Sequence, residues 1–231
     1  MPARRLVLFD IDGTLVRAGP VAGAVFDRAV EAVLGAAPVE RVTMSGKTDP
    51  QIVREYLELL GHDPSHLPAV LAELELKLAA AAHELAEHGQ ALPGVANLLQ
   101  SLAADARFHL SVLTGNIAPN AVVKLSAFGL DKWLDMETGA YGSDNEDRRL
   151  LVPVALRRLA ELRDVHLGPQ DTWVVGDTER DLACARAGGA HCVLVATGRY
   201  SFDELSALGA DAVVADLSRT EEITALLSAG L

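Results

Sequence analysis

The sequence predicts a doubly wound α/β fold, in which helices cover both faces of a parallel sheet, and two observations support this prediction. Short apolar runs of strand length recur along the chain, and most are separated by stretches of helical periodicity, so strands are expected to alternate with helices. The runs carry almost no polar residues, as is typical of parallel strands buried on both faces. They lie at residues 6–9, 110–113, 173–175, 192–195 and 212–214.

The connection after the first strand is too long for one crossover helix. Between Asp12 and the second strand, helical patterns occur at residues 21–34, 49–60, 67–88 and 95–104. We expect the fourth pattern to be the crossover helix of the sheet and the first three to form a small all-helical domain. Asp49-Pro50 would supply the N-cap and the first turn of the second helix in that domain.

The helical domain is expected to span residues 16–90, inserted into a core made of residues 1–15 and 91–231. Gly19-Pro20 and Pro93-Gly94 mark the two crossings, because pairs of Gly and Pro usually lie in turns. A chain of 231 residues is long enough for one core with such an insertion.

Composition and charge restrict the functions that the protein can have. Half of the residues are apolar and 23% are charged, as in ordinary folded proteins, and the net charge of −12 makes nucleic acid and anionic membranes poor partners. The start resembles a secretion signal, but Asp10 ends its apolar run, and no window is apolar enough for a membrane span. We expect a cytoplasmic protein. Cys184 and Cys192 form no metal-binding or redox pair and are expected to be buried thiols.

Polar residues follow three of the predicted strands where each strand ends, which is where open parallel sheets bind ligands. They are Asp10-Ile11-Asp12-Gly13-Thr14, Thr114-Gly115-Asn116 and Gly176-Asp177 through Asp181. At least four carboxylates would meet at one edge, and we expect a divalent cation to offset their repulsion. Because the candidate ligands are all oxygens, Mg²⁺ is the expected ion.

The same loops suit a phosphoryl group. Asp10 and Asp12 lie two residues apart and would face the same side, so that one carboxylate can attack while the other manages protons. Thr114 offers a hydroxyl group. Gly115 and Asn116 offer backbone N–H groups near the start of a helix, which is a common anion site.

Each motif also has a local explanation. Asp-x-Asp-Gly is a common capped turn, and Asp177 and Asp181 could be an N-cap and a first-turn acid of the following helix. Three such coincidences at the ends of three parallel strands would be rare, so we favour one shared site.

Together these motifs resemble those of the haloacid dehalogenase-like hydrolase superfamily, and within it the phosphoglycolate phosphatase-like group. Residues 8–15 look like the first motif of that family, residues 113–116 like its second and residues 175–181 like its fourth. The resemblance implies a Rossmann-like core with a helical cap inserted after the first motif, where the sequence itself indicates an insertion.

The resemblance also implies roles for these residues. Asp10 would be the nucleophile that forms an aspartyl-phosphate, and Asp12 would protonate the leaving oxygen and then activate water. Mg²⁺ would be held by Asp10, the Asp12 carbonyl and Asp177, with Asp181 at the edge of the site, directly or through water. Thr114 would bind a phosphoryl oxygen. The other residues expected to contact substrate in these loops are Gly13, Thr14, Gly115 and Asn116.

The third motif departs from the family pattern, which has a lysine at the start of the helix that leads to the third strand. Here the segment reads Asp147-Arg148-Arg149-Leu150. We expect Arg148 to replace the lysine, with Arg149 as the fallback, because arginine keeps the charge and adds a fork that fits phosphate. A solvated basic pair is the alternative. Lys124 is a poorer candidate, since it lies mid-helix and is expected on the surface.

In the predicted cap, residues 45–49 form a polar loop before a helix, and the loop resembles the cap loop that faces the active site in the family. Lys47 could reach substrate anions from this loop. It could equally be a solvated lysine beside a helix cap.

We therefore expect a magnesium-dependent phosphatase that acts on a small phosphorylated metabolite, similar to phosphoglycolate phosphatases. A sugar phosphomutase of the same superfamily would use the same carboxylates and differ only in its cap. A phosphate-binding protein without turnover is the third possibility, although binding alone does not require Asp12. A dehalogenase or phosphonate-cleaving enzyme is disfavoured, because dehalogenation needs no acid at Asp12 and the resembling phosphonate enzymes lack one. The sequence does not decide between a monomer and a homodimer.

Overall fold

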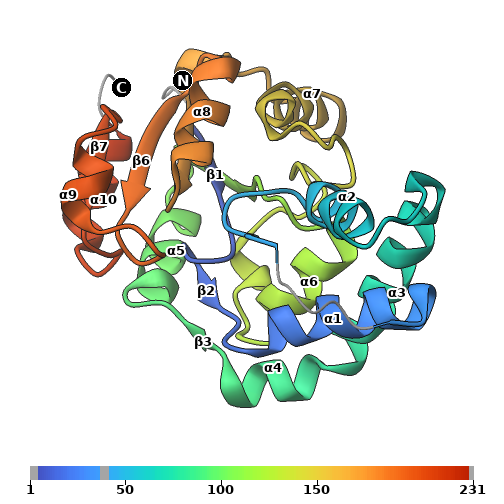
Figure 1. The fold of residues 1–231 in the computed structure, drawn as a ribbon. Coiled ribbons are helices and arrows are strands. Elements are labelled where there is room, and N and C mark those ends of the chain that lie inside the picture. The colour runs from blue at the N-terminus through green and yellow to red at the C-terminus, as the bar shows by residue number, and fades with distance from the viewer. Residues whose placement is uncertain (1–4, 37–41, 229–231) are drawn as a thin grey trace.

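The computed structural model describes residues 5–36 and 42–228. Residues 1–4, which begin the signal-like stretch, lie outside the described residues. A five-stranded parallel sheet lies at the centre of the core, in the order β4-β1-β5-β6-β7 (Figure 1). Its strands are β1 (Arg5–Phe9), β4 (Phe108–Val112), β5 (Thr172–Gly176), β6 (His191–Val195) and β7 (Ala212–Val214).

Alternate residues of β1 point to opposite faces of the sheet, and both faces are covered by helices. Val7 and Phe9 belong to one hydrophobic cluster, and Leu6 and Leu8 belong to another. The first cluster includes residues of α5 (Val95–Ala103), α6 (Ala118–Ser126) and α10 (Thr220–Leu227), and the second those of α7 (Leu151–Arg163), α8 (Glu179–Gly188) and α9 (Phe202–Ser206). This arrangement confirms the predicted doubly wound α/β fold.

Because all five strands are parallel, their carboxyl ends lie at one edge, and the loops that follow them meet there. Within the described part of the chain, four short 3₁₀ helices lie in the connections, at Pro64–His66, Asp131–Trp133, Arg148–Leu150 and Pro169–Asp171. The third of these helices places Arg148 at the edge that the carboxylates share. Both cysteines, Cys184 and Cys192, are buried free thiols, as the sequence predicts.

Four helices after β1 pack around a third hydrophobic cluster, away from the sheet (Figure 1). They are α1 (Val21–Leu34), α2 (Asp49–Leu59), α3 (Leu67–Ala80) and α4 (Ala82–His88). Tyr56 and Leu74 are fully buried at their centre. Val123 of α6 and Ala127, its C-cap, pack against the same cluster, so α6 contacts both the sheet and the inserted helices.

Two predictions about helix ends in this part are wrong. Residues 67–88 form two helices, because the backbone at Ala81 (φ −92°, ψ 8°) leaves the helical region. No Gly or Pro marks this break in the sequence. The break lets α4 pack against α1 and α6. The N-cap of α2 is Thr48, whose Oγ1 accepts a hydrogen bond from the Gln51 N–H at 3.3 Å, so Asp49 is free to act elsewhere.

A two-stranded antiparallel ribbon joins the two crossings between the sheet and the inserted helices. It consists of β2 (Val16–Arg17) and β3 (Gln90–Ala91), which are too short to show a pattern in the sequence. The domain limits predicted at residues 16 and 90 fall on this ribbon, and the division into two domains stays a prediction. Among the described helices, none is long and apolar enough to cross a membrane.

Candidate active site

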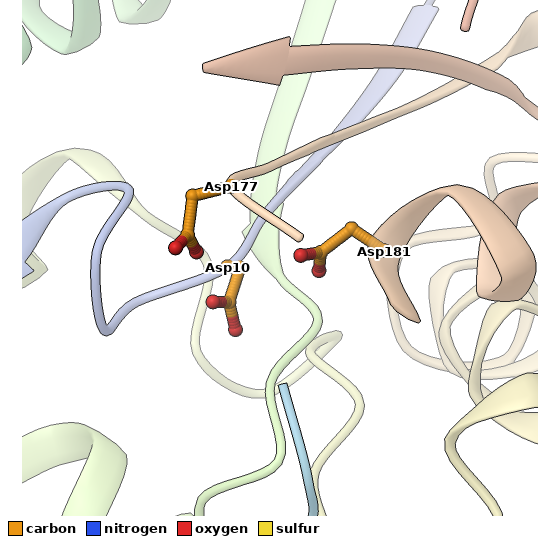
Figure 2. Close-up of side chains that lie close together, drawn as sticks. All are labelled: Asp10, Asp177 and Asp181. Atoms are coloured by element: carbon orange, nitrogen blue, oxygen red, sulfur yellow. The ribbon is translucent and has the colours of Figure 1, made fainter. Parts of the chain in front are cut away.

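Three carboxylates from two neighbouring strands lie together at the carboxyl edge of the sheet (Figure 2). Asp10 follows β1, Asp177 follows β5, and Asp181 lies in the first turn of α8; one oxygen from each lies within 4.8 Å of the others. All three side chains are buried. Burial raises the pKa of Asp10 and of Asp177 well above the range usual for carboxyl groups, and the charge of Asp181 adds to both shifts. Such a cluster favours a bound cation.

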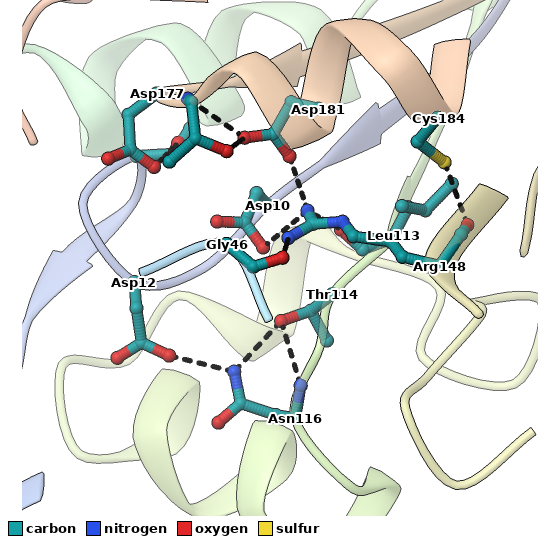
Figure 3. Close-up of polar contacts among 12 residues, drawn as sticks. Asp10, Asp12, Gly46, Leu113, Thr114, Asn116, Arg148, Asp177, Asp181 and Cys184 are labelled. Carbon is teal, nitrogen blue, oxygen red and sulfur yellow. Dashed lines mark hydrogen bonds and ion pairs between the residues drawn. The ribbon is translucent and has the colours of Figure 1, made fainter. Parts of the chain in front are cut away.

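Arg148 is one cation already present at this cluster (Figure 3). Its Nη2 lies 3.0 Å from Asp10 Oδ1 and also contacts Asp181 Oδ1. The guanidinium also donates to the backbone carbonyls of Gly46, at 3.2 Å, and Leu113, at 3.3 Å. Burial opposes its charge, but Asp181 and Asp10 more than offset that cost and hold the pKa of Arg148 above its usual value. Arg148 is therefore firmly ionised and oriented toward Asp10.

The neighbouring residues explain why Arg148 rather than Arg149 faces the site. Asp147 caps the 3₁₀ helix by accepting the Arg149 N–H at 3.0 Å, and it pairs with the exposed Arg149 side chain at 2.7 Å. The Cys184 thiol of α8 donates to the Arg148 carbonyl at 3.1 Å. These contacts turn the two consecutive arginines in different directions, so the structure places the preferred candidate at the carboxylates and the fallback in solvent.

The three clustered carboxylates differ in how well they could bind a divalent metal. Both oxygens of Asp181 are already engaged, because Oδ1 pairs with Arg148 and Oδ2 accepts from the N–H and the hydroxyl of Thr178, at 3.0 and 2.7 Å. Asp10 and Asp177 keep oxygens available, and hard oxygen ligands suit Mg²⁺ or Ca²⁺. Gly13 has a φ of +90°, and a Cβ there would press on the Asp177 carboxylate. The close approach of this loop thus requires glycine.

Asp12, Thr114 and Asn116 form a second polar group beside the first (Figure 3). The Asn116 side-chain amide donates to Asp12 Oδ2 and to Thr114 Oγ1, both at 2.8 Å. Lys124 joins them: its Nζ lies 2.6 Å from Asp12 Oδ2 and 2.6 Å from Asn116 Oδ1. The expectation that Lys124 lies on the surface is wrong, since only 6% of this residue is exposed. Helical spacing could have revealed it, because Lys124 shares a helix face with buried Ala121 and Leu125.

Of the two N–H groups expected to bind an anion, those of Gly115 and Asn116, the second already has a partner, and so does the N–H of the following residue, Ile117. The Asn116 N–H donates to Thr114 Oγ1 at 3.3 Å, and the Ile117 N–H donates to Asp49 Oδ2 at 2.8 Å. Asp49 is buried and belongs to the inserted helices. The sequence predicted it only as a helix cap. Burial raises the pKa of Asp49 to about 6, against the opposing charge of Lys124.

The loop before α2 closes over this edge of the sheet. The Asp49 N–H donates to the Gly115 carbonyl at 2.7 Å, and a Cβ on Gly115 would overlap the Lys47 carbonyl. A cavity of about 150 Å³ lies between the inserted helices and the core. It is lined by Asp10, Asp12, Thr114, Asn116, Lys124 and Arg148 on one side and by Ala22, Phe26, Met44, Lys47, Asp49 and Ile52 on the other. Lys47 thus reaches the cavity, with its Nζ 2.5 Å from Glu55.

Of the remaining predicted contacts, Thr14 lies beside the carboxylate cluster, where its hydroxyl donates to Asp177 Oδ1 at 3.4 Å. The motifs predicted at the three strand ends therefore meet at one edge.

A comparison with protein families identifies this arrangement. The family model of haloacid dehalogenase-like hydrolases matches residues 7–195, which include the three strand-end motifs and the inserted helices. The chain belongs to this family. The haloacid dehalogenase-like hydrolase is 30% identical over 221 residues to the phosphoglycolate phosphatase of Rhodospirillum rubrum, a match that covers 93% of this chain and 88% of the relative. It is therefore a hydrolase that groups with the phosphatases of the family.

Solved structures share the fold of this haloacid dehalogenase-like hydrolase. A predicted phosphatase from Clostridium acetobutylicum superposes with a TM-score of 0.70 at 19% identity, over 96% of this chain and 99% of the other. CbbY from Rhodobacter sphaeroides, solved in complex with phosphate, superposes with a TM-score of 0.67 at 21% identity, over 94% and 96%. Both matches extend through the inserted helices, which agrees with a capped hydrolase fold.

Proposed function

We propose that this hydrolase is a magnesium-dependent phosphatase that cleaves a small phosphomonoester through an aspartyl-phosphate on Asp10. The observation that carries the proposal is the position of the Asp10 carboxylate, which lies beside Asp177 and is paired with Arg148 at 3.0 Å. A buried carboxylate becomes a useful nucleophile toward phosphate when surrounding positive charge offsets the repulsion between two anions.

Each residue has a defined task in this reaction. Asp10 attacks phosphorus, and Arg148 orients it through their ion pair. Thr114, which lines the cavity, would donate a hydrogen bond from its hydroxyl to a phosphoryl oxygen. Asp12 gives a proton to the leaving oxygen and later removes one from the water that attacks the phosphoenzyme.

The metal belongs to the same proposal. Asp10 and Asp177 would hold Mg²⁺ together with the Asp12 carbonyl, and Asp181 would act through Arg148 or through water because its own oxygens are engaged. When bound, Mg²⁺ supplies charge that neutralises the transferring phosphoryl group and lowers the pKa of its own ligands.

The cavity limits the size and character of the substrate. Its volume of about 150 Å³ is smaller than the roughly 300–1,000 Å³ of sites that hold drug-sized ligands. A sugar phosphomutase must hold a sugar bisphosphate, so the enclosed volume favours a small ester. Because the relatives include phosphoglycolate phosphatases, phosphoglycolate is the first substrate to test, and Lys47, at the cavity wall, could meet its carboxylate.

The decisive experiment measures inorganic phosphate released from a panel of small phosphomonoesters, phosphoglycolate included, with and without Mg²⁺. We expect metal-dependent release by the wild type and none by Asp10→Asn. A folded wild type that releases no phosphate from any ester in Mg²⁺ would refute the phosphatase proposal.

The unpaired state of both cysteines is usual in reducing compartments and agrees with a cytoplasmic location.

A further inference from the structure

The site holds a second buried cation whose position the family motifs do not explain. Lys124 lies in α6, eight residues beyond Asn116, and its ammonium group reaches back to the start of the helix. It donates to Asp12 Oδ2 and to Asn116 Oδ1, each at 2.6 Å. The side chain is only 7% exposed, whereas that of its partner Asp12 is 41% exposed. Arg148 and Lys124 thus have different carboxylate partners: Arg148 meets Asp10, and Lys124 meets Asp12.

The contacts of Asp12 are one-sided. Its Oδ2 accepts hydrogen bonds from both Lys124 and Asn116, at 2.6 and 2.8 Å. Within residues 5–36 and 42–228, no side chain or N–H group is recorded as a donor to its Oδ1. Figure 3 shows the Asp12 carboxylate turned toward Asn116 and away from Asp10. Two donors on one oxygen fix the orientation of the whole carboxylate and leave the other oxygen for the substrate.

The surroundings of α6 hold Lys124 in this position. Ala121 and Leu125 pack against the sheet, while Val123 and Ala127 pack against the inserted helices. The aliphatic stem of Lys124 therefore runs between two packed surfaces, and only its charged end reaches a polar environment. A buried ammonium group is costly unless it is paired and hydrogen-bonded, and both conditions are met here by active-site residues.

We propose that Lys124 is a positioning residue that, together with Asn116, holds Asp12 Oδ2 so that Oδ1 faces the leaving oxygen of the substrate. The proposal rests on the function proposed above, in which Asp12 is the acid. In the first step the bond between Asp10 and phosphorus forms, the bond from phosphorus to the leaving oxygen breaks, and the proton on Asp12 Oδ1 moves to that oxygen. Lys124 transfers no proton and keeps both of its hydrogen bonds throughout.

This role predicts a dependence on the leaving group. An alkyl phosphate leaves as a strongly basic alkoxide and needs the proton from Asp12, whereas an acyl phosphate leaves as a weakly basic carboxylate and does not. Ethyl phosphate and acetyl phosphate form a suitable pair because they are nearly equal in size. If Lys124 acts through Asp12, replacing Lys124 should therefore lower the rate on ethyl phosphate and leave the rate on acetyl phosphate nearly unchanged.

The test compares kcat/KM of wild type, Lys124→Gln and Asp12→Asn on both substrates in Mg²⁺. General acid catalysis typically contributes roughly 10²–10⁴-fold, so we expect a loss of about 10²-fold for Lys124→Gln on ethyl phosphate and less than about threefold on acetyl phosphate. Asp12→Asn should show the same pattern with a larger loss, and the double variant should lose no more than Asp12→Asn alone. Lys77→Gln is the matched control and should match wild type, because Lys77 pairs with Glu73 within α3 and does not line the cavity.

Several results would overturn the proposal. Equal losses on the two substrates, whether from misfolding or from a direct contact between Lys124 and the phosphoryl group, contradict a role through Asp12, and so does an unchanged kcat/KM on ethyl phosphate. Lys124→Arg provides the second variant: its fork can still donate to Asp12, so it should recover most of the ethyl phosphate activity that Lys124→Gln loses. The phosphatase proposal fails separately, if the wild type releases no phosphate or if Asp12→Asn lacks the leaving-group dependence.

Discussion

At the scale of single residues, the strongest electrostatic contact of the site is that of Arg148. Its guanidinium is enclosed by two carboxylates and two backbone carbonyls, and only 5% of the residue is exposed. Planar arginine can make these contacts in several directions at once, which a lysine ammonium on a flexible stem cannot do equally well. Arg148 is therefore expected to support both the fold and the orientation of Asp10.

Replacing Arg148 by Met should lower the free energy of unfolding by about 3–5 kcal/mol, because it leaves Asp10 and Asp181 buried without a counter-charge. Urea denaturation at neutral pH without Mg²⁺ measures this loss. Arg149→Met is the control at the next position, where the side chain is exposed, and it should leave the unfolding midpoint unchanged. Equal midpoints for the two variants would contradict the role assigned to Arg148.

Asp49 makes stability depend on pH. The pKa of Asp49 is raised to about 6 in the folded protein from 3.8, because burial disfavours the carboxylate. The folded state therefore binds the proton more tightly than the unfolded state, and stability is lost as the pH rises from about 4 to 6. Asp49→Asn removes this cost while its side-chain oxygen can still accept the Ile117 N–H.

We expect Asp49→Asn to raise the free energy of unfolding at pH 8 by on the order of 2 kcal/mol and to change it little at pH near 4. Urea denaturation of both proteins at the two pH values is the measurement. A difference between variant and wild type that is the same at both pH values would show that the Asp49 carboxylate carries no cost of ionisation.

At the scale of elements, the sequence predicts the parallel strands and α1 well because their patterns are local. The site follows from them, since parallel strands bring the residues after each strand to one edge. The break at Ala81 and the ribbon of β2 and β3 escape prediction for the opposite reason, because both depend on packing between distant segments. Lys124 was expected at the surface and Asp49 as a helix cap, and both are buried instead because the inserted helices pack against this edge of the core.

The contact between the loops before α2 and α6 determines how the inserted helices close over the core. Gly115→Ala should disturb it, because the new Cβ meets the Lys47 carbonyl, which cannot move without shifting the loop. We expect kcat/KM for the preferred substrate to fall at least about tenfold, together with a stability loss of about 1–3 kcal/mol from overpacking.

Gly129→Ala is the control that separates the fall in kcat/KM from the loss of stability. Gly129 has a φ of +63° and nothing within 4 Å of the new methyl group, so the substitution strains the backbone far from the site. It should lower stability and leave kcat/KM unchanged. Wild-type kcat/KM in Gly115→Ala, or an equal loss in Gly129→Ala, would show that the loop contact does not control closure.

At the scale of the whole molecule, the protein carries a net charge of −12 and still gathers three buried carboxylates at one point. Arg148 balances part of this charge, but the pKa values of Asp10 and Asp177 stay raised, mainly because both groups are buried and also because the clustered carboxylates repel one another. Without a metal, these two groups oppose folding increasingly as the pH rises from the usual carboxyl range toward their raised values. Metal and protons therefore compete for the same oxygens, and the stability of the chain should depend on both.

Mg²⁺ is accordingly expected to stabilise the protein more at high pH than at low pH. At a concentration about a hundred times its Kd, a bound ligand adds about 2.7 kcal/mol to the free energy of unfolding. We expect Mg²⁺ to raise the free energy of unfolding by about this amount at pH 8.5 and by almost nothing at pH 5.5, where protons occupy the ligands. Thermal unfolding at the two pH values, with and without Mg²⁺, is the measurement. NaCl at matched ionic strength controls for screening of the net charge, and Asp177→Asn should abolish the gain. A gain that is equal at both pH values, or that persists in Asp177→Asn, would place the ion elsewhere on the protein, because only ligands with raised pKa values make the affinity fall so steeply as the pH is lowered.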